Sequence, residues 1–107
     1  MLTKEVKCGF KGKMNDREAD AFCSVVKRLK TPIWIQKGNR RVNGKIKAAI
    51  LNLNIQEGET ITLILDDYFS NEEELTMLAQ LLEGGCNREM YSDIIKQLPE
   101  PSSQNYI

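Results

Sequence analysis

Apolar residues recur along this chain with two spacings, one typical of strands and one typical of helices. Alternation of charged and apolar residues predicts a half-buried strand over Thr3–Cys8. Runs rich in apolar and β-branched residues predict further strands over Ile33–Gln36 and Thr60–Leu65, and a short strand is predicted over Arg40–Asn43, directly after a hairpin turn. A Gly-Asn pair at 38 and 39 predicts a hairpin turn between the second and third strands.

Helical spacing predicts a long helix after Asn15, a short one over Gly44–Leu53, a long one from Ser70 to the glycines at 84 and 85, and a last one after them. The apolar positions are Ala19, Phe22, Cys23, Val26 and Leu29, then Ile46, Ala49, Ile50 and Leu53, then Leu75, Leu78, Ala79 and Leu82, then Tyr91, Ile94, Ile95 and Leu98. Asn15 with Glu18, and Ser70 with Glu73, have the spacing of capping boxes. Asp66–Phe69 is predicted to be a loop. The order is β-α-β-β-α-β-α with one added helix.

Composition places the chain among globular proteins, with 107 residues, 41% hydrophobic and 28% charged. No apolar run reaches the ~18 residues that a spanning helix needs, and no leader pattern opens the chain, so we expect a cytoplasmic protein. The three cysteines, Cys8, Cys23 and Cys86, show no metal-binding spacing and are interpreted as reduced thiols that pack in the core. We expect no metal and no cofactor. The chain has no histidine, which argues against histidine-dependent catalysis and phosphohistidine chemistry.

Charge is divided unevenly along the chain although it sums to zero. Residues 1–50 hold 13 Lys and Arg against 4 Asp and Glu, whereas residues 51–107 hold 2 against 11. Two interpretations stay open. The halves interleave and their charges pair on the surface, or Lys11, Lys13, Lys45 and Lys47 form a basic surface near Arg17 that attracts an acidic partner or phosphate.

The start of the first long helix is a candidate site. Its free backbone N–H groups and positive dipole end suit an anion, and the guanidinium of Arg17 lies in the first turn. The simpler interpretation is that Asn15 and Glu18 only cap a helix and that Arg17 is solvated. Asp16 and Glu18 add negative charge, which favours a protein partner over a phosphate ligand.

From about Thr3 to Glu83 the chain resembles the HPr family of phosphocarrier proteins of the sugar phosphotransferase system. The resemblance rests on Lys4-Glu5-Val6, Arg17-x-Ala19-x-x-Phe22, Gly38-x-x-x-Val42-Asn43-x-Lys45 and Gly58-x-x-Ile61-Thr62. It implies an α+β fold, an open-faced sandwich in which a four-stranded antiparallel sheet of order 1-4-2-3 has three helices on one face.

The same resemblance implies which residues occupy the family's functional positions. The family motif Gly-Leu-His-x-Arg-Pro-Ala falls on residues 13–19, so Asn15 replaces the phosphorylated histidine, Glu18 replaces the proline, and Asp16 and Arg17 flank the site. The regulatory serine falls on Ile46, and the partner-binding positions fall on Lys47, Ala48 and Leu51. An asparagine amide has no nucleophilic nitrogen, so we expect phosphotransfer to be lost.

These observations favour a non-enzymatic regulatory or protein-binding module whose partner is acidic or belongs to the phosphotransferase system. One alternative is a phosphocarrier that uses another residue, such as Cys23 or Ser24. Another is nucleic-acid binding by the basic half, which the sparse aromatic residues disfavour. We expect no nucleic acid and no membrane as partners.

The HPr-like domain is expected to span residues 1–85. The segment after it is predicted to form an added helix over 86–98, packed on or extending the domain, and then a flexible tail over 99–107. Strand alternation turns Trp34 and Ile64 to the sheet face that carries no helices. The added helix is therefore predicted to pack over Trp34 and Ile64, or to make a homodimer contact there.

Overall fold

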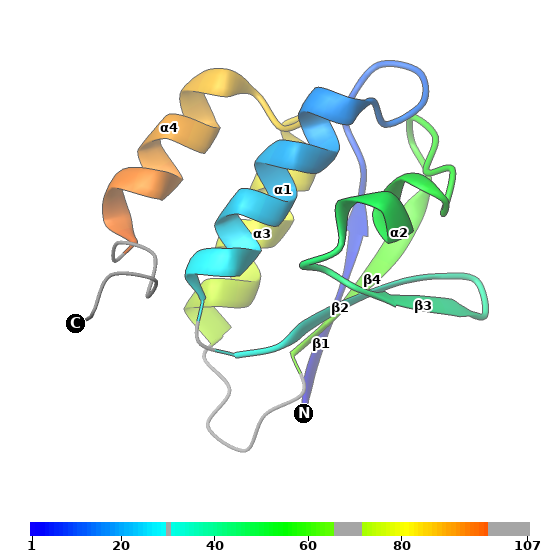
Figure 1. Cartoon of the computed structure of the whole chain (residues 1–107), viewed down its shortest axis with the longest axis horizontal. Coiled ribbons are helices and arrows are strands. Elements are labelled where there is room, and N and C mark those ends of the chain that lie inside the picture. The colour runs from blue at the N-terminus through cyan, green and yellow to red at the C-terminus, as the bar shows by residue number, and fades with distance from the viewer. Residues whose placement is uncertain (30, 66–71, 99–107) are drawn as a thin grey trace.

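The computed structural model of the protein describes residues 1–29, 31–65 and 72–98, and these form two layers (Figure 1). Four strands make one antiparallel sheet in the order β1-β4-β2-β3, and helices cover one of its faces. The elements are β1 (Leu2–Lys7), α1 (Asp16–Arg28), β2 (Ile33–Lys37), β3 (Arg40–Asn43), α2 (Lys47–Leu51), β4 (Thr60–Leu65), α3 (Glu72–Glu83) and α4 (Arg88–Gln97). The predicted α+β fold and strand order are confirmed.

Strand register places alternate side chains on the two sheet faces. β4 lies between β1 and β2, and its Leu63 is opposite Lys4 on one side and Ile35 on the other. Gly38, with φ of 62°, closes the predicted hairpin between β2 and β3. The register sends one apolar row toward the helices.

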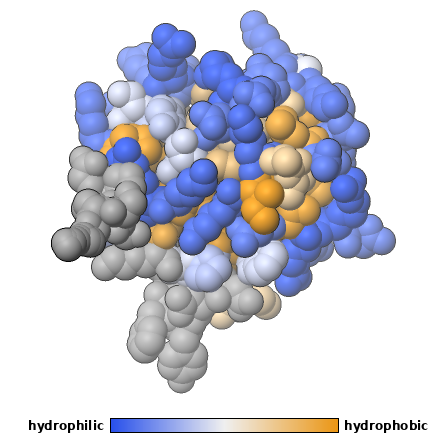
Figure 2. Space-filling model, in the orientation of Figure 1, coloured by the Kyte–Doolittle hydropathy of each residue, from blue (hydrophilic) through white to orange (hydrophobic). Residues whose placement is uncertain are grey.

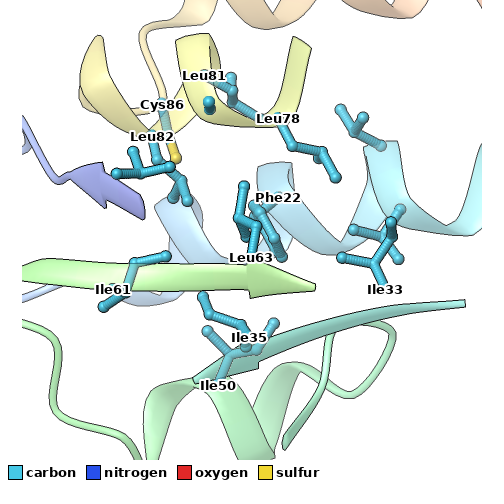
Figure 3. Packing of buried hydrophobic residues seen from close by; sticks show 14 of the residues in the cluster. Phe22, Ile33, Ile35, Ile50, Ile61, Leu63, Leu78, Leu81, Leu82 and Cys86 are labelled. Atoms are coloured by element: carbon cyan, nitrogen blue, oxygen red, sulfur yellow. The ribbon is translucent and has the colours of Figure 1, made fainter. Parts of the chain in front are cut away.

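The core fills the space between the sheet and the helices α1, α2 and α3 (Figure 3). The side chains of Phe22, Ile35, Ile50, Leu63 and Leu78 are each fully buried there. The predicted stripes of α1 and α3 are confirmed, because every residue assigned to them is buried.

α2 differs from its prediction at both ends. The helix spans only Lys47–Leu51, and Ile46 is its N-cap with no side-chain capping bond. Ile50 and Leu53 are buried, whereas Ile46 is 52% exposed. Because the helix starts one residue later than the periodicity requires, Ile46 does not share the buried face.

The end of α3 lies against the segment that follows β1. The Gly9 N–H donates to the Leu82 carbonyl at 2.9 Å, and a Cβ at Gly9 would collide with the Glu83 carbonyl. Gly85 takes a φ of 73°, and the Cys86 N–H donates to the Leu81 carbonyl at 2.8 Å. The predicted glycine stop of this helix is confirmed, and it permits a close backbone approach.

The position predicted for the added helix is wrong. α4 contacts α1 and α3, on the helical side of the sheet, instead of covering Trp34 and Ile64 (Figure 1). Its Ile94 is 5% exposed and belongs to the main core, with Tyr91 and Ile95 packed against it. α1 and α3 carry buried apolar residues beyond the predicted stripes, including the fully buried Val25 and Leu81, and α4 contacts both helices.

The outer sheet face keeps Trp34 and Ile64 as direct neighbours across β2 and β4. Ile64 is only 3% exposed and Trp34 is half-buried, and Ile64 is also opposite Thr3. The alternative of a homodimer contact at this face stays a prediction.

Three expectations lie outside the described residues: the loop Asp66–Phe69, the Ser70–Glu73 capping box and the flexible tail. Within the part of the chain that the structure describes, no helix is both long and apolar enough to cross a bilayer.

Candidate functional site

The N-terminus of α1 is closed by its own side chains. The Asn15 Oδ1 accepts from the Glu18 N–H, and the Glu18 Oε1 accepts from the Asn15 N–H, both at 2.8 Å. Glu18 is 6% exposed, and this reciprocal bond satisfies its carboxylate. The predicted capping box is confirmed, and the Asn15 amide oxygen is already in use.

The loop before α1 is fastened to the segment that follows α2. The Met14 N–H donates to the Ile55 carbonyl at 2.8 Å, and the backbones of Lys13 and Gln56 form an isolated antiparallel β-bridge. The Glu57 N–H donates to the Gly12 carbonyl at 2.7 Å. The position of Asn15 is therefore set by two segments about forty residues apart.

An ion pair joins α1 to α2. The Lys47 Nζ lies 3.1 Å from Asp16 Oδ1 and 3.9 Å from Asp20 Oδ1. The hydrogen bond and charge of Asp16 raise the pKa of Lys47 above its ordinary value. The pair is solvent-exposed, so it orients α2 more than it stabilises the fold.

α2 presents an apolar surface that polar residues surround (Figure 2). Ile46 and Ala48 are exposed and Leu51 is half-buried. Apolar residues grouped on one exposed surface are typical of a protein-binding surface. We call Ile46, Lys47, Ala48 and Leu51 the α2 surface.

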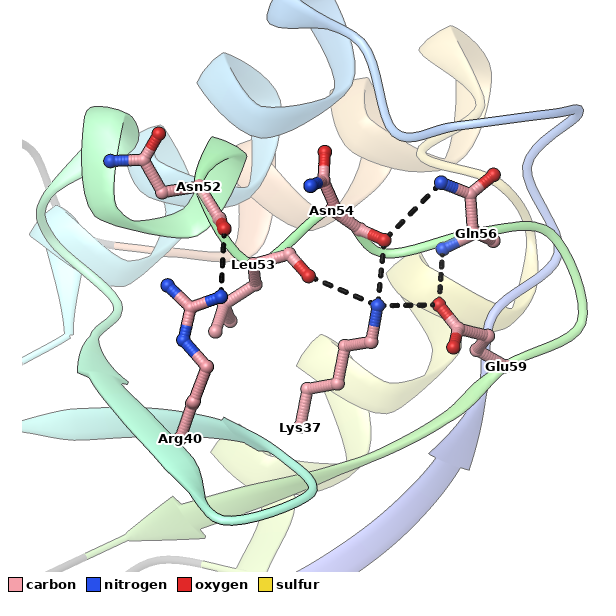
Figure 4. Close-up of polar contacts among 7 residues, drawn as sticks. All are labelled: Lys37, Arg40, Asn52, Leu53, Asn54, Gln56 and Glu59. Atoms are coloured by element: carbon pink, nitrogen blue, oxygen red, sulfur yellow. Dashed lines mark hydrogen bonds and ion pairs between the residues drawn. The ribbon is translucent and has the colours of Figure 1, made fainter.

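A shallow hollow of about 570 Å³ lies between the start of α1 and the end of α2. Its lining residues are Lys13, Met14, Asn15, Asp16, Leu51, Asn52 and Asn54. Side chains of the β2–β3 hairpin are hydrogen-bonded to residues 52–54, which form one edge of this hollow (Figure 4). The Lys37 Nζ donates to the carbonyls of Leu53 at 3.0 Å and Asn54 at 2.7 Å, and Arg40 donates to the Asn52 carbonyl at 3.1 Å.

The structure brings most of the expected site residues together. Asn15 and Asp16 share the hollow with Leu51, and Lys47 contacts Asp16. Arg17 instead lines a second hollow, between α1 and α4. Of the lysines proposed as a basic surface, Lys13 lines the first hollow, while Lys47 is neutralised by Asp16.

The cysteines lie in the core. Burial raises the pKa of Cys8 and of Cys86 to about 12, and it also raises the pKa of Cys23. Among the described residues, no cluster of three or more His, Cys, Asp or Glu side chains could hold a metal ion.

Sequence reasoning missed Asn52 and Asn54 at the first hollow and Arg88 and Tyr91 at the second. Periodicity marks residues that pack, and Asn52 and Asn54 lie just beyond a helix end. The predicted position of the added helix, on the other face of the sheet, put Arg88 far from Arg17. The apolar pairs Ala21–Val25 on α1 and Met77–Leu81 on α3, each spaced by four residues, were the available signal.

Comparisons with known proteins agree with this arrangement. Residues 2–84 match the family described as PTS HPr component phosphorylation site. The HPr-like protein Crh of Halalkalibacterium halodurans is 33% identical over 79 residues, which cover 74% of this chain and 90% of that protein.

Two solved structures share the fold. HPr-C-His from Thermoanaerobacter tengcongensis gives a TM-score of 0.72 at 25% identity, covering 79% of this chain and 94% of that one. The phosphocarrier protein HPr from Bacillus anthracis str. Ames gives 0.69 at 30% identity, covering 76% and 95%. α4 begins after the residues that match the family.

Proposed function

The chain belongs to the HPr family of phosphocarrier proteins of the phosphotransferase system, and from this premise we propose that it is a protein-binding regulatory module without phosphotransfer competence. The observation that carries the proposal is the state of Asn15. Its side chain is an amide whose oxygen accepts the Glu18 N–H in a closed capping box. An amide in this position offers no nucleophile to a phosphohistidine donor.

Binding is assigned to the α2 surface together with Asn15 and Asp16. The exposed side chain of Ile46 adds apolar area beside Ala48 and Leu51. A hydroxyl at position 46 is absent, so a kinase that modifies a serine there has no target. The Lys47–Asp16 ion pair joins α2 to α1, and the two helices together form the proposed surface.

The alternative acceptors are poorly placed for phosphotransfer. Cys23 is 2% exposed and burial raises its pKa, which disfavours the thiolate. Ser24 is half-buried in the third turn of α1, away from the helix N-terminus.

Phosphoryl transfer is tested directly by incubating the protein with enzyme I and labelled phosphoenolpyruvate. We expect no label on this chain, with the Bacillus anthracis HPr as the positive control. Stoichiometric label on the protein, located by peptide mass spectrometry, would overturn the loss of phosphotransfer.

Binding is tested separately with unlabelled enzyme I, as a member of the phosphotransferase system, by calorimetry. Leu51→Ala and Lys47→Glu are expected to weaken binding about tenfold or more, because they remove apolar area and reverse a charge. Lys27→Glu, a matched charge reversal on an exposed lysine in the last turn of α1, should leave it unchanged. Equal effects of all the variants, or no binding, would contradict this surface and this class of partner.

A further inference from the structure

A second hollow lies between α1 and α4, outside the α2 surface. It measures about 190 Å³ and is lined by Arg17, Asp20, Ala21, Arg88 and Tyr91. α1 and α4 lie side by side and start at the same end of the molecule (Figure 1). Arg17 is in the first turn of α1 and Arg88 is the first residue of α4, and both arginines line this one hollow.

The cationic groups of this hollow are free to bind. Within residues 1–29, 31–65 and 72–98, neither Arg17 nor Arg88 has a hydrogen-bond or ion-pair partner. A guanidinium presents several N–H donors in a planar fork that matches an oxyanion, and the Tyr91 hydroxyl adds one more donor. Two guanidinium groups in one small hollow are typical of a site that holds an oxyanion from two sides.

The charge of the hollow selects among oxyanions. Asp20 is the acidic residue of its lining, so the lining carries a net charge of +1 with the two arginines. The Lys47 Nζ lies 3.9 Å from the Asp20 carboxylate and partly neutralises it on the side of α2. A carboxylate carries one negative charge and neutralises this lining, whereas a phosphate ester carries close to two and would leave the hollow with a net negative charge.

We propose that this hollow binds the carboxylate of an aspartate or glutamate side chain on the partner protein, held between Arg17 and Arg88 with Tyr91 as a third donor. This inference rests on the proposed function, because it names the chemistry that the partner contributes. It extends the binding surface from α2 across the start of α1 to α4. Arg88 and Tyr91 lie beyond the family match at 2–84, so this chain adds them to that surface.

The experiment uses the full chain and N-acetyl-glutamate amide, which carries one side-chain carboxylate. Backbone and arginine side-chain NMR signals are followed at constant ionic strength. We expect shifts at Arg17, Arg88 and Tyr91, and an apparent affinity about tenfold lower in Arg88→Gln, since a hydrogen bond to a charged group is lost. Arg28→Gln, the same change at the other end of α1, serves as the matched control and should bind as the unmodified chain does.

Three outcomes would overturn the inference: no shifts at the hollow, equal binding by Arg88→Gln and the unmodified chain, or tighter binding of N-acetyl-phosphoserine amide than of the carboxylate. Arg88 is exposed, so Arg88→Gln should keep the fold, and unchanged amide signals in the sheet will verify this. The measurement needs neither enzyme I nor phosphoenolpyruvate. Label on the chain would therefore overturn the proposed function and leave this result standing, while failure here leaves the labelling result untouched.

Discussion

Asn15 is a structural residue as well as the centre of a proposed binding surface. Its amide oxygen holds the Glu18 N–H, and its own N–H is held by the Glu18 carboxylate. Removing the Asn15 side chain leaves the Glu18 N–H without its acceptor, and removing the Glu18 side chain leaves the Asn15 N–H without its acceptor. Glu18 is buried, so water does not readily replace the lost bond there. Any substitution at Asn15 therefore tests stability and function at once, and the two must be measured separately.

We predict that Asn15→Ala lowers the free energy of unfolding by about 1–2 kcal/mol, because it removes the N-cap oxygen and leaves the Glu18 backbone N–H without its acceptor. Urea unfolding followed by circular dichroism measures the change. Asn15→Ser keeps a capping oxygen and should stay within about 0.5 kcal/mol of the unmodified chain. A loss as large for serine as for alanine would show that the cap is not the cause.

The buried thiols make stability depend on alkaline pH. The pKa of Cys8 and of Cys86 is about 12 in the folded chain, against 9.0 for the unperturbed thiol. Between these values the unfolded chain holds fewer protons than the folded one, so the free energy of unfolding falls as pH rises. The raised pKa of Lys47 acts in the same direction, because its stabilisation is lost once pH passes that pKa.

We predict that stability declines above about pH 9, by up to about 1.4 kcal/mol per pH unit for each buried thiol. Urea unfolding at several alkaline pH values gives the slope. Cys86→Ala should make the slope shallower than in the unmodified chain, and comparison of the two removes the contribution of Lys47. Identical slopes would contradict the assignment to Cys86.

At the scale of elements, the sequence predicts β2 well because its alternate residues point to one buried face. The alternation of Ile33, Trp34 and Ile35 fixes which residues point inward, and the glycine at 38 fixes the hairpin. The sequence does not predict where α4 packs, because the apolar face of an amphipathic helix shows that it is buried but not which element covers it. The second apolar sides of α1 and α3 decide that position, and a single-stripe description omits them.

We predict that Ile94→Ala lowers the free energy of unfolding by about 2–4 kcal/mol, because Ile94 is buried in the core between α4 and its neighbours. Trp34 lies on the other face of the sheet, so its fluorescence should not change. Denaturant unfolding and emission spectra measure both effects. Asp93→Ala, at an exposed position of the same helix, is the control, and a shifted Trp34 emission would contradict the observed packing of α4.

At the scale of the whole molecule, the acidic and basic halves of the sequence are folded together. Lys37 of the basic half lies 3.0 Å from Glu59 of the acidic half. The candidate site also joins the two halves, because residues 55–57 of the acidic half are hydrogen-bonded to the loop before α1 in the basic half. The sequence could place Asn15 and the α2 residues on one surface only through the family resemblance, since their proximity depends on tertiary contacts.

We predict that Lys37→Gln raises the pKa of Glu59 only part of the way to its ordinary value. The Gln56 N–H is the larger cause of the lowered pKa, and it remains in the variant. The lowered pKa means that Glu59 contributes stability above about pH 4.5, which is lost as pH falls through the folded pKa. Carboxyl NMR titration measures the shift, and a complete return to the ordinary pKa would contradict the role of Gln56.

The position of β1 has a consequence for how the chain is made. β1 is the first element in the sequence, yet its partners are β4 and α3, and its register pairs Leu2 with Leu65. During synthesis β1 has no strand to pair with until about sixty further residues, up to the end of β4, have left the ribosome. The hairpin of β2 and β3 joins neighbouring segments, whereas the pairing of β1 with β4 has to close a long loop, which costs more chain entropy. The sheet therefore cannot be completed before β4 is made, and the contact of Gly9 with α3 cannot form before α3 follows.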